Sequence, residues 1–264
     1  MRNLFLKIIR DKKAFIIGWS IGLLFLGFAM MTFYPSFSGG EIDQLLTDLQ
    51  PILQGLIGSI QDWKQIPGYI GSQIFDIRLP LFIGVMAILL AVGLSVGEED
   101  KGQLRTLVAL PISRTKIVLT KWLAIVTICA ITSVATVLGV FIGVLGIGES
   151  VDGSVLLRLG FMTTLLATAL ASIIFAFGIA TGFVGTTKAV GVVVAAGSFL
   201  LTTFAQSVSW LEGVAWLSIF HYFPAATVAK EGIAFGNVLV LALLIAVSLA
   251  AAIFFFRRRD IKDT

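Results

Sequence analysis

Histidine and cysteine are almost missing from this 264-residue chain, because each occurs once, as His221 and Cys129. A single histidine excludes a site built from several histidines and leaves no His-Glu-x-x-His motif. A single cysteine cannot form a disulfide within the chain, so cysteine usage does not reveal the redox compartment. We therefore expect neither a metal site nor a catalytic residue, and no cofactor held by the chain itself.

Charge is also scarce, since charged residues make up 13% of the chain and hydrophobic residues 58%, whereas about 25% of a soluble domain is charged. About 20 apolar residues in a helix cross a hydrocarbon core of about 30 Å. The sequence therefore predicts an all-α integral membrane protein with six transmembrane helices, forming one domain over residues 1–264. The uncharged segments that qualify as spans are 14–34, 79–96, 122–148, 159–184, 189–207 and 238–256.

The six spans lack Asp, Glu, Lys and Arg, which disfavours ion-coupled transport, because such transport usually uses a charged relay at membrane depth. The chain also lacks a phosphate-binding loop: in the run from Gly182 to Lys188, Thr187 stands where the motif requires glycine. Any ATPase must then be a separate polypeptide. Hydroxyl and amide side chains remain, and they suit either hydrogen bonds between helices or a translocation path: Thr127, Thr136, Thr168, Thr202 and Gln206.

The distribution of lysine and arginine predicts the orientation of the chain. If the N-terminus is cytoplasmic, 15 of the 19 basic residues fall in cytoplasmic segments, as the positive-inside rule requires. Both termini and the segment 97–121 are then cytoplasmic. The formal net charge of +4 divides into a positive inner side and a negative outer side, so it does not indicate nucleic-acid binding.

Three further segments carry patterns. In residues 1–13, apolar residues share one helical face and cations lie elsewhere, which predicts either an amphipathic helix on the membrane surface or a frayed start to the first span. The external segment 35–78 repeats apolar residues at spacings of three and four, which predicts an amphipathic helix that packs on the bundle or covers a substrate path. In 208–237, short apolar runs broken at Pro224 predict an external re-entrant hairpin before the last span.

The segment 97–121 interrupts two apolar runs with charge. Acidic residues at 98–100 suit the positive end of a short helix, Pro111 ends that helix, and Ser113 can cap the next one. From the residues alone, this segment is either a docking element for a cytoplasmic partner or a positively charged anchor without one. One face of the short helix carries its apolar residues: Leu104, Leu107 and Val108.

The same segment carries a motif. From residue 98 to residue 121 it reads E-E-x-x-G-x-L-R-T-L-x-x-x-P-I-S-R-x-x-I-x-x-x-K. This closely resembles the loop after the second span in permeases of the second ABC-transporter class, the ABC-2 type or type V exporters. The resemblance extends over the whole chain, through the basic amphipathic start, the six spans, the hairpin and the ending FFFRRRDI at 254–261.

The resemblance implies a non-catalytic permease subunit in the plasma membrane, driven by a separate ATP-binding cassette ATPase that binds the ATP. Two permease copies, or this chain and a paralogue, would form the transport path within the lipid bilayer. The alternatives are a membrane scaffold or assembly factor that holds a cytoplasmic partner and, third, a secondary transporter. By resemblance, a coupling helix and its flanks would be formed by Glu98, Glu99, Gly102, Leu104, Arg105, Pro111, Ser113, Arg114 and Lys121.

Overall fold

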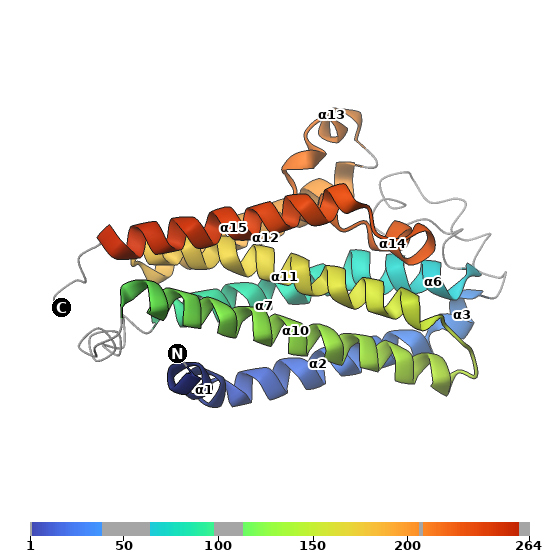
Figure 1. The fold of residues 1–264 in the computed structure, drawn as a ribbon. Helices are drawn as coiled ribbons and strands as arrows, with labels where there is room; N and C mark the ends of the chain where they lie inside the picture. The colour runs from blue at the N-terminus through green and yellow to red at the C-terminus, as the bar shows by residue number, and fades with distance from the viewer. Residues whose placement is uncertain (1, 39–63, 98–112, 206–207, 259–264) are drawn as a thin grey trace.

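The computed structural model describes residues 2–38, 64–97, 113–205 and 208–258. Within these ranges the chain is helical and contains no strand. Its long helices lie side by side in one bundle, and the start of α1 lies at the same end of the bundle as the end of α15 (Figure 1). We call this the terminal end and the opposite end the far end.

Six helical runs within the described ranges are long and apolar enough to cross a membrane. The long helices are α2 (Lys13–Thr32), α7 (Leu79–Leu94), α10 (Arg114–Gly146), α11 (Gly153–Thr181), α12 (Val184–Ala205) and α15 (Phe235–Arg258). The shorter elements are α1 (Arg2–Asp11), α3 (Tyr34–Ser38), α6 (Ile66–Tyr69), the π-helix η2 (Ile70–Arg78), α13 (Ser209–Glu212), the 3-10 helices η3 (Ala215–Leu217) and η4 (Phe220–Tyr222), and α14 (Ala225–Glu231).

The second helical run is longer than the apolar segment that predicted it. It begins at Ile66 with Pro67 in its first turn, where proline is tolerated, and continues through α6, η2 and α7 to Leu94. The sequence analysis began this span at residue 79 because Arg78 is charged. In the structure, Arg78 Nη1 donates to the main-chain oxygen of Gln73 at 2.5 Å and to its Oε1 at 2.7 Å. The helix therefore accommodates the guanidinium without ending.

α11 lies at the centre of the bundle and packs against α7, α10, α12 and α15. Of its most apolar 18-residue window, 78% is buried, compared with 17% for the α2 run and 11% for α15. The outer helices thus direct apolar side chains away from the protein, as lipid contact requires. Examples on α2 and α15 are Ile17, Ile21, Phe25, Leu239, Leu243 and Val247.

α2 packs along α10 over much of its length. The contact is close because Gly139 on α10 lies directly against the backbone of Leu24, so that a Cβ at this position would collide with the Leu24 carbonyl oxygen. The sequence contained glycines four apart, at 139 and 143, as a pattern that permits such contact. The structure identifies α2 as the helix that uses it.

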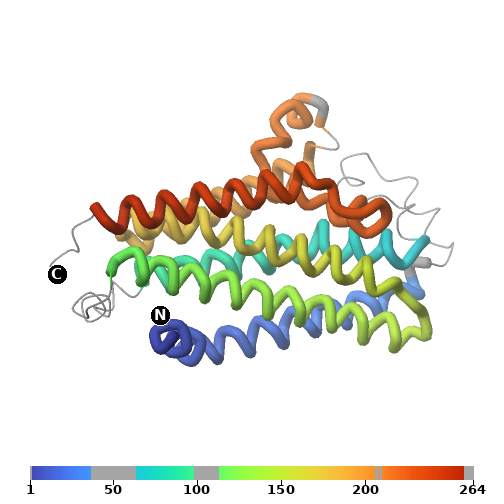
Figure 2. Tube along the Cα trace, viewed as in Figure 1, coloured from blue at the N-terminus to red at the C-terminus, as the bar shows by residue number. Residues whose placement is uncertain are grey.

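At the terminal end, α1 is a separate short helix, and its apolar face packs against the core around buried Ile8. Toward the far end, residues 208–237 form a series of short helices (Figure 2). α13 projects from the bundle, whereas α14 packs against α6, η2 and α11. Pro224 precedes α14, as expected of a residue that separates two helical pieces.

Candidate functional site

The start of α10 is tied to the end of α15. Ser113 has extended backbone angles and caps α10, with its Oγ 3.4 Å from the amide nitrogen of Lys116. Arg114 Nη1 donates to the main-chain oxygen of Phe256 at 3.2 Å and lies 3.5 Å from that of Arg257. A cation beside the C-terminal part of a helix is favoured by the negative end of the helix dipole, so this contact stabilises the pairing of α10 with α15.

The other residues assigned to coupling divide into two groups. Lys121 is only 3% exposed and lies in the second turn of α10, so it packs inside the bundle at the terminal end. The sequence analysis had included it in the flanks of the coupling helix, within the cytoplasmic segment 97–121. Six residues of the same assignment lie outside the described part of the chain: Glu98, Glu99, Gly102, Leu104, Arg105 and Pro111.

The residues assigned to a translocation path differ in their surroundings where the structure describes them. Thr127 and Thr136 donate back to carbonyls of their own helix, those of Leu123 at 2.8 Å and Thr132 at 2.9 Å. Thr168 is buried within α11, and Gln206 lies outside the described residues. A hydroxyl group does take part in a hydrogen bond between two helices: Trp122 Nε1 on α10 donates to Ser172 Oγ on α11 at 3.0 Å.

Thr202 takes part in a polar contact between α12 and the short helices. Its Oγ1 lies 2.5 Å from Ser218 Oγ, which also donates to the main-chain oxygen of Ser198 at 2.7 Å. The amide of Phe220 donates to the same Ser218 hydroxyl at 3.2 Å. The Ser218 hydroxyl therefore holds the segment 215–222 against α12. The backbone of that segment is not helical at Ser218.

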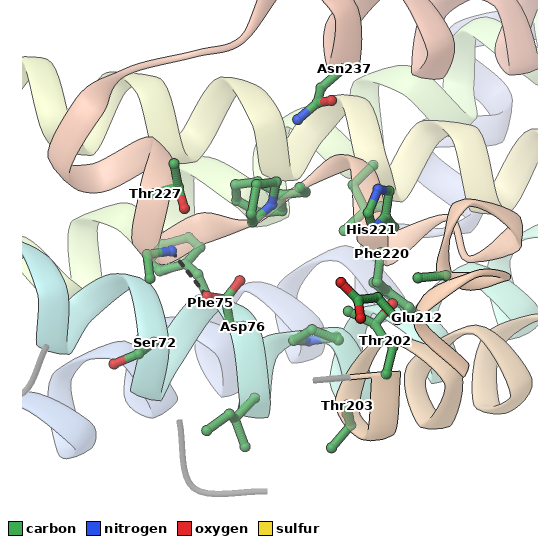
Figure 3. A pocket seen from close by; sticks show the side chains of 18 residues that line it. Ser72, Phe75, Asp76, Thr202, Thr203, Glu212, Phe220, His221, Thr227 and Asn237 are labelled. Atoms are coloured by element: carbon green, nitrogen blue, oxygen red, sulfur yellow. Dashed lines mark hydrogen bonds between the residues drawn. The ribbon is translucent and has the colours of Figure 1, made fainter. Parts of the chain in front are cut away.

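Thr202 also lines a cavity of about 640 Å³ in the far-end half of the bundle, which we call the polar cavity (Figure 3). The wall combines side chains from η2, α12, α13, η3, η4, α14 and α15 with Pro80 of α7 and Leu166 of α11. Buried aromatic rings form part of it. Its polar side chains are Ser72, Asp76, Thr202, Thr203, Glu212, His221, Thr227 and Asn237.

Asp76 joins the wall of the polar cavity to α14. Its Oδ1 accepts the amide of Ala225 at 2.6 Å and its Oδ2 accepts that of Ala226 at 3.0 Å. Both amides belong to the first turn of α14, whose N–H groups have no partner within the helix. Beside this cap, Gly71 of η2 lies so close that a Cβ would come within 2.6 Å of Ala226 Cα. Glycine is required there by the close approach of two backbones.

Sequence reasoning missed Asp76 because it placed residue 76 in the external segment 35–78, outside the spans. A signal was available: Pro67 marks a helix start, and neither proline nor an acid follows before Asp76. The π-helical geometry of η2 had no comparable signal. Such helices are rare and occur often at functional sites, usually as single turns, whereas η2 extends over nine residues.

A bundle of six long apolar helices with outward-facing apolar side chains defines a multi-pass membrane protein. The family model described as ABC-2 family transporter protein matches residues 3–261. The chain belongs to this family and is a transmembrane permease of the ABC transporter group, which confirms the resemblance identified in the sequence. A comparison with curated proteins finds no match.

Proposed function

We propose that the chain is the permease subunit of an ABC exporter, in which a separate ATPase subunit docks on the segment 97–121 and drives efflux. The terminal end of the bundle is then cytoplasmic, the far end is external, and a second permease copy or paralogue completes the transporter in the plasma membrane. Family membership supports this function, because ABC-2 permeases work with an ATP-binding cassette subunit. The residues 208–237 would form the external re-entrant hairpin.

The single contact that carries the mechanism is the one from Arg114 to the carbonyls of Phe256 and Arg257. Arg114 stands directly after the proposed coupling helix, and α15 is a peripheral helix that packs on α10 and α11. A displacement of the segment 97–121 by the ATPase would therefore move α10 and α15 together. Hydrogen bonds from a charged donor contribute about 1.5–3 kcal/mol, so this link favours a joint movement of the two helices.

The basic residues also support a cytoplasmic terminal end. Lys12, between α1 and α2, lies across Gly93 of α7, with its Nζ 2.7 Å from the position that a Cβ would occupy. Arg257 and Arg258 end α15 at the same end. Cations at this end face the anionic inner leaflet if the terminal end is cytoplasmic.

The test is co-expression of the tagged chain with an ABC ATPase encoded beside it, followed by purification in detergent and measurement of ATP hydrolysis in nanodiscs. We expect a complex to be isolated, and Glu98→Ala with Glu99→Ala to reduce co-purification several-fold. We expect the Arg114→Ala permease to remain bound to the ATPase. Its rate of ATP hydrolysis should change at least threefold, because a movement of α10 would no longer be coupled to α15.

Lys116→Ala is the matched control, because Lys116 carries the same charge in the same turn of α10 and is exposed. Its complex should retain the wild-type hydrolysis rate within a factor of two. Purification of the chain without any ABC ATPase would favour the scaffold alternative. Wild-type behaviour of the double Glu98 and Glu99 variant would show that the coupling assignment is wrong.

A further inference from the structure

The polar cavity carries charge of only one sign. Asp76 and Glu212 both point into it (Figure 3), and the described residues that line it include neither lysine nor arginine. Among the described lining residues, the imidazole of His221 is the other titratable side chain. The exposed carboxylate of Glu212 would repel an anion in such a space, whereas it would attract a cation.

Several polar side chains in the cavity have no partner in the part of the chain that the structure describes. Glu212 makes neither a hydrogen bond nor an ion pair there, unlike Asp76, whose oxygens accept the amides of α14. The side chains of Thr203, Thr227 and Asn237 likewise make no hydrogen bond within the described chain. A cavity whose convergent polar groups are unused by the fold has the composition of a ligand site.

The walls of the cavity are aromatic and apolar. Phe75 is 1% exposed, Phe220 5% and Phe223 3%, so their rings are held in place by packing. Glu212, by contrast, is exposed and marks the mouth of the cavity. An aromatic ring attracts a cation through the negative face of its π-system, in addition to the apolar contact. The cavity thus combines a carboxylate at its mouth with an aromatic interior.

These features select among cations. A metal ion requires several converging ligands, and the described residues contain no group of three or more His, Cys, Asp or Glu side chains that could hold one. The volume of about 640 Å³ falls within the range of about 300–1,000 Å³ found for small-molecule sites. An organic cation with an apolar body uses both the carboxylate and the rings.

We propose that the polar cavity binds an amphipathic organic cation, with Glu212 facing its charged group and Phe75, Phe220 and Phe223 contacting its apolar part. Asp76 holds α14 in the wall through its two hydrogen bonds. As a statement about the exported substrate class, this inference rests on the proposed function. As a statement about binding, it concerns this chain alone.

The test uses two probes of nearly equal shape and opposite charge, tetraphenylphosphonium and tetraphenylborate. Binding of each is measured by equilibrium dialysis against the full chain in phosphatidylcholine nanodiscs, with protein-free nanodiscs as background. We expect saturable binding of the cation, weakened roughly fivefold to tenfold by Glu212→Gln, because the site loses its free carboxylate while its shape is kept. Glu212→Lys should abolish cation binding and strengthen binding of the anion at least fivefold.

Glu231→Gln is the control, since Glu231 is an exposed acid at the end of α14 that does not line the cavity. It should bind the cation within a factor of two of wild type. Phe220→Leu, which keeps an apolar side chain but removes the ring, should weaken cation binding about threefold and supplies a second test independent of charge. Cation binding no greater than in empty nanodiscs, or unchanged by Glu212→Gln, would overturn the inference.

The outcomes separate this inference from the proposed function. An ABC ATPase that co-purifies with a chain unable to bind the cation leaves the exporter assignment standing and overturns the cation site. Saturable binding that depends on Glu212 supports the site even if no ATPase co-purifies, because the measurement uses neither ATP nor a partner.

Discussion

Two close helix contacts in this bundle are built by opposite means. Between α2 and α10, regular α-helices approach through Gly139, which lies against the backbone of Leu24. Between η2 and α14, the approach also uses a glycine, Gly71, but it adds the Asp76 carboxylate, which accepts two main-chain amides of α14. The contact between α2 and α10 depends on van der Waals fit alone, whereas the contact between η2 and α14 adds hydrogen bonds to a carboxyl group.

The difference follows from what each helix must satisfy. Along α2 and α10, backbone groups are paired within their own helices, so only van der Waals contact is needed for association in lipid. α14 is a seven-residue helix that begins inside the bundle, and its first amides have no partner of their own. A polar side chain from a neighbouring element must supply one, and this places a carboxylate in the wall of a cavity.

The largest predicted effect tests the contact made by shape alone. Gly139→Val should lower the free energy of unfolding by about 3 kcal/mol or prevent folding, because its Cβ would meet backbone atoms of Leu24, which cannot rotate away. The measurement is the thermal midpoint of the purified chain in detergent, followed by size-exclusion chromatography.

Gly18→Val is its control, since Gly18 is exposed on α2 and an added Cβ there meets nothing within 4 Å. We expect a change of only a few tenths of a kcal/mol from helix propensity. Equal effects of the two substitutions would show that α2 and α10 are not in close contact.

The second prediction concerns the contact between η2 and α14, in which the Asp76 carboxyl group accepts hydrogen bonds. Asp76→Ala should cost about 2 kcal/mol, because two amides of α14 lose their acceptor in a water-poor setting. Asp76→Asn keeps one acceptor oxygen and should fall between Ala and wild type. Thermal midpoints give the order, and hydrogen exchange of the Ala225 and Ala226 amides locates the effect. Faster exchange elsewhere but not at these amides would contradict the cap.

The sequence predicted the shape-based contact better than the charged one. A span is recognised by its uncharged residues, so the six helices could be anticipated. Glycines four apart, as at 139 and 143, permit a close contact, but only the structure identifies α2 as the partner. Asp76 and Ala225 are separated by 149 positions. When the distant partner of Asp76 is not known, an acidic residue beside an apolar run indicates the end of a span and the start of a loop.

The same limit applies at the terminal end. The motif identified the family, and Ser113 was correctly expected to cap a helix. The contact of Arg114 with Phe256 spans 142 positions and could not be predicted from the motif. Nor could the polar cavity be predicted, since its lining residues are spread along the chain between Ser72 and Asn237 and meet only in the folded bundle.

The smallest predicted effect compares Asp76 with a carboxylate that caps a helix in solvent. Asp152 Oδ1 accepts the Ser154 amide at 2.9 Å at the start of α11, and Asp152 Oδ2 accepts the Ser154 hydroxyl at 2.9 Å. The hydrogen bond from the amide has the larger effect and that from the hydroxyl the smaller one, and both lower the pKa of Asp152 below its usual 3.8. The positive charge of Arg158 lowers this pKa further. At neutral pH, Asp152→Asn should lower the thermal midpoint, but by less than Asp76→Ala, because water competes for an exposed cap.

The pH dependence gives this prediction its sign. The folded pKa of Asp152 is depressed, so its contribution is fully present above the unfolded pKa of about 3.9 and is lost as pH falls through the lower folded value. The difference in thermal midpoint between wild type and Asp152→Asn should therefore be constant from pH 7 to about pH 5 and shrink toward pH 3. Because Asn cannot titrate, a difference that stayed constant down to pH 3 would show that the cap acts through shape, as Gly139 does, rather than through the charge of the Asp152 carboxylate.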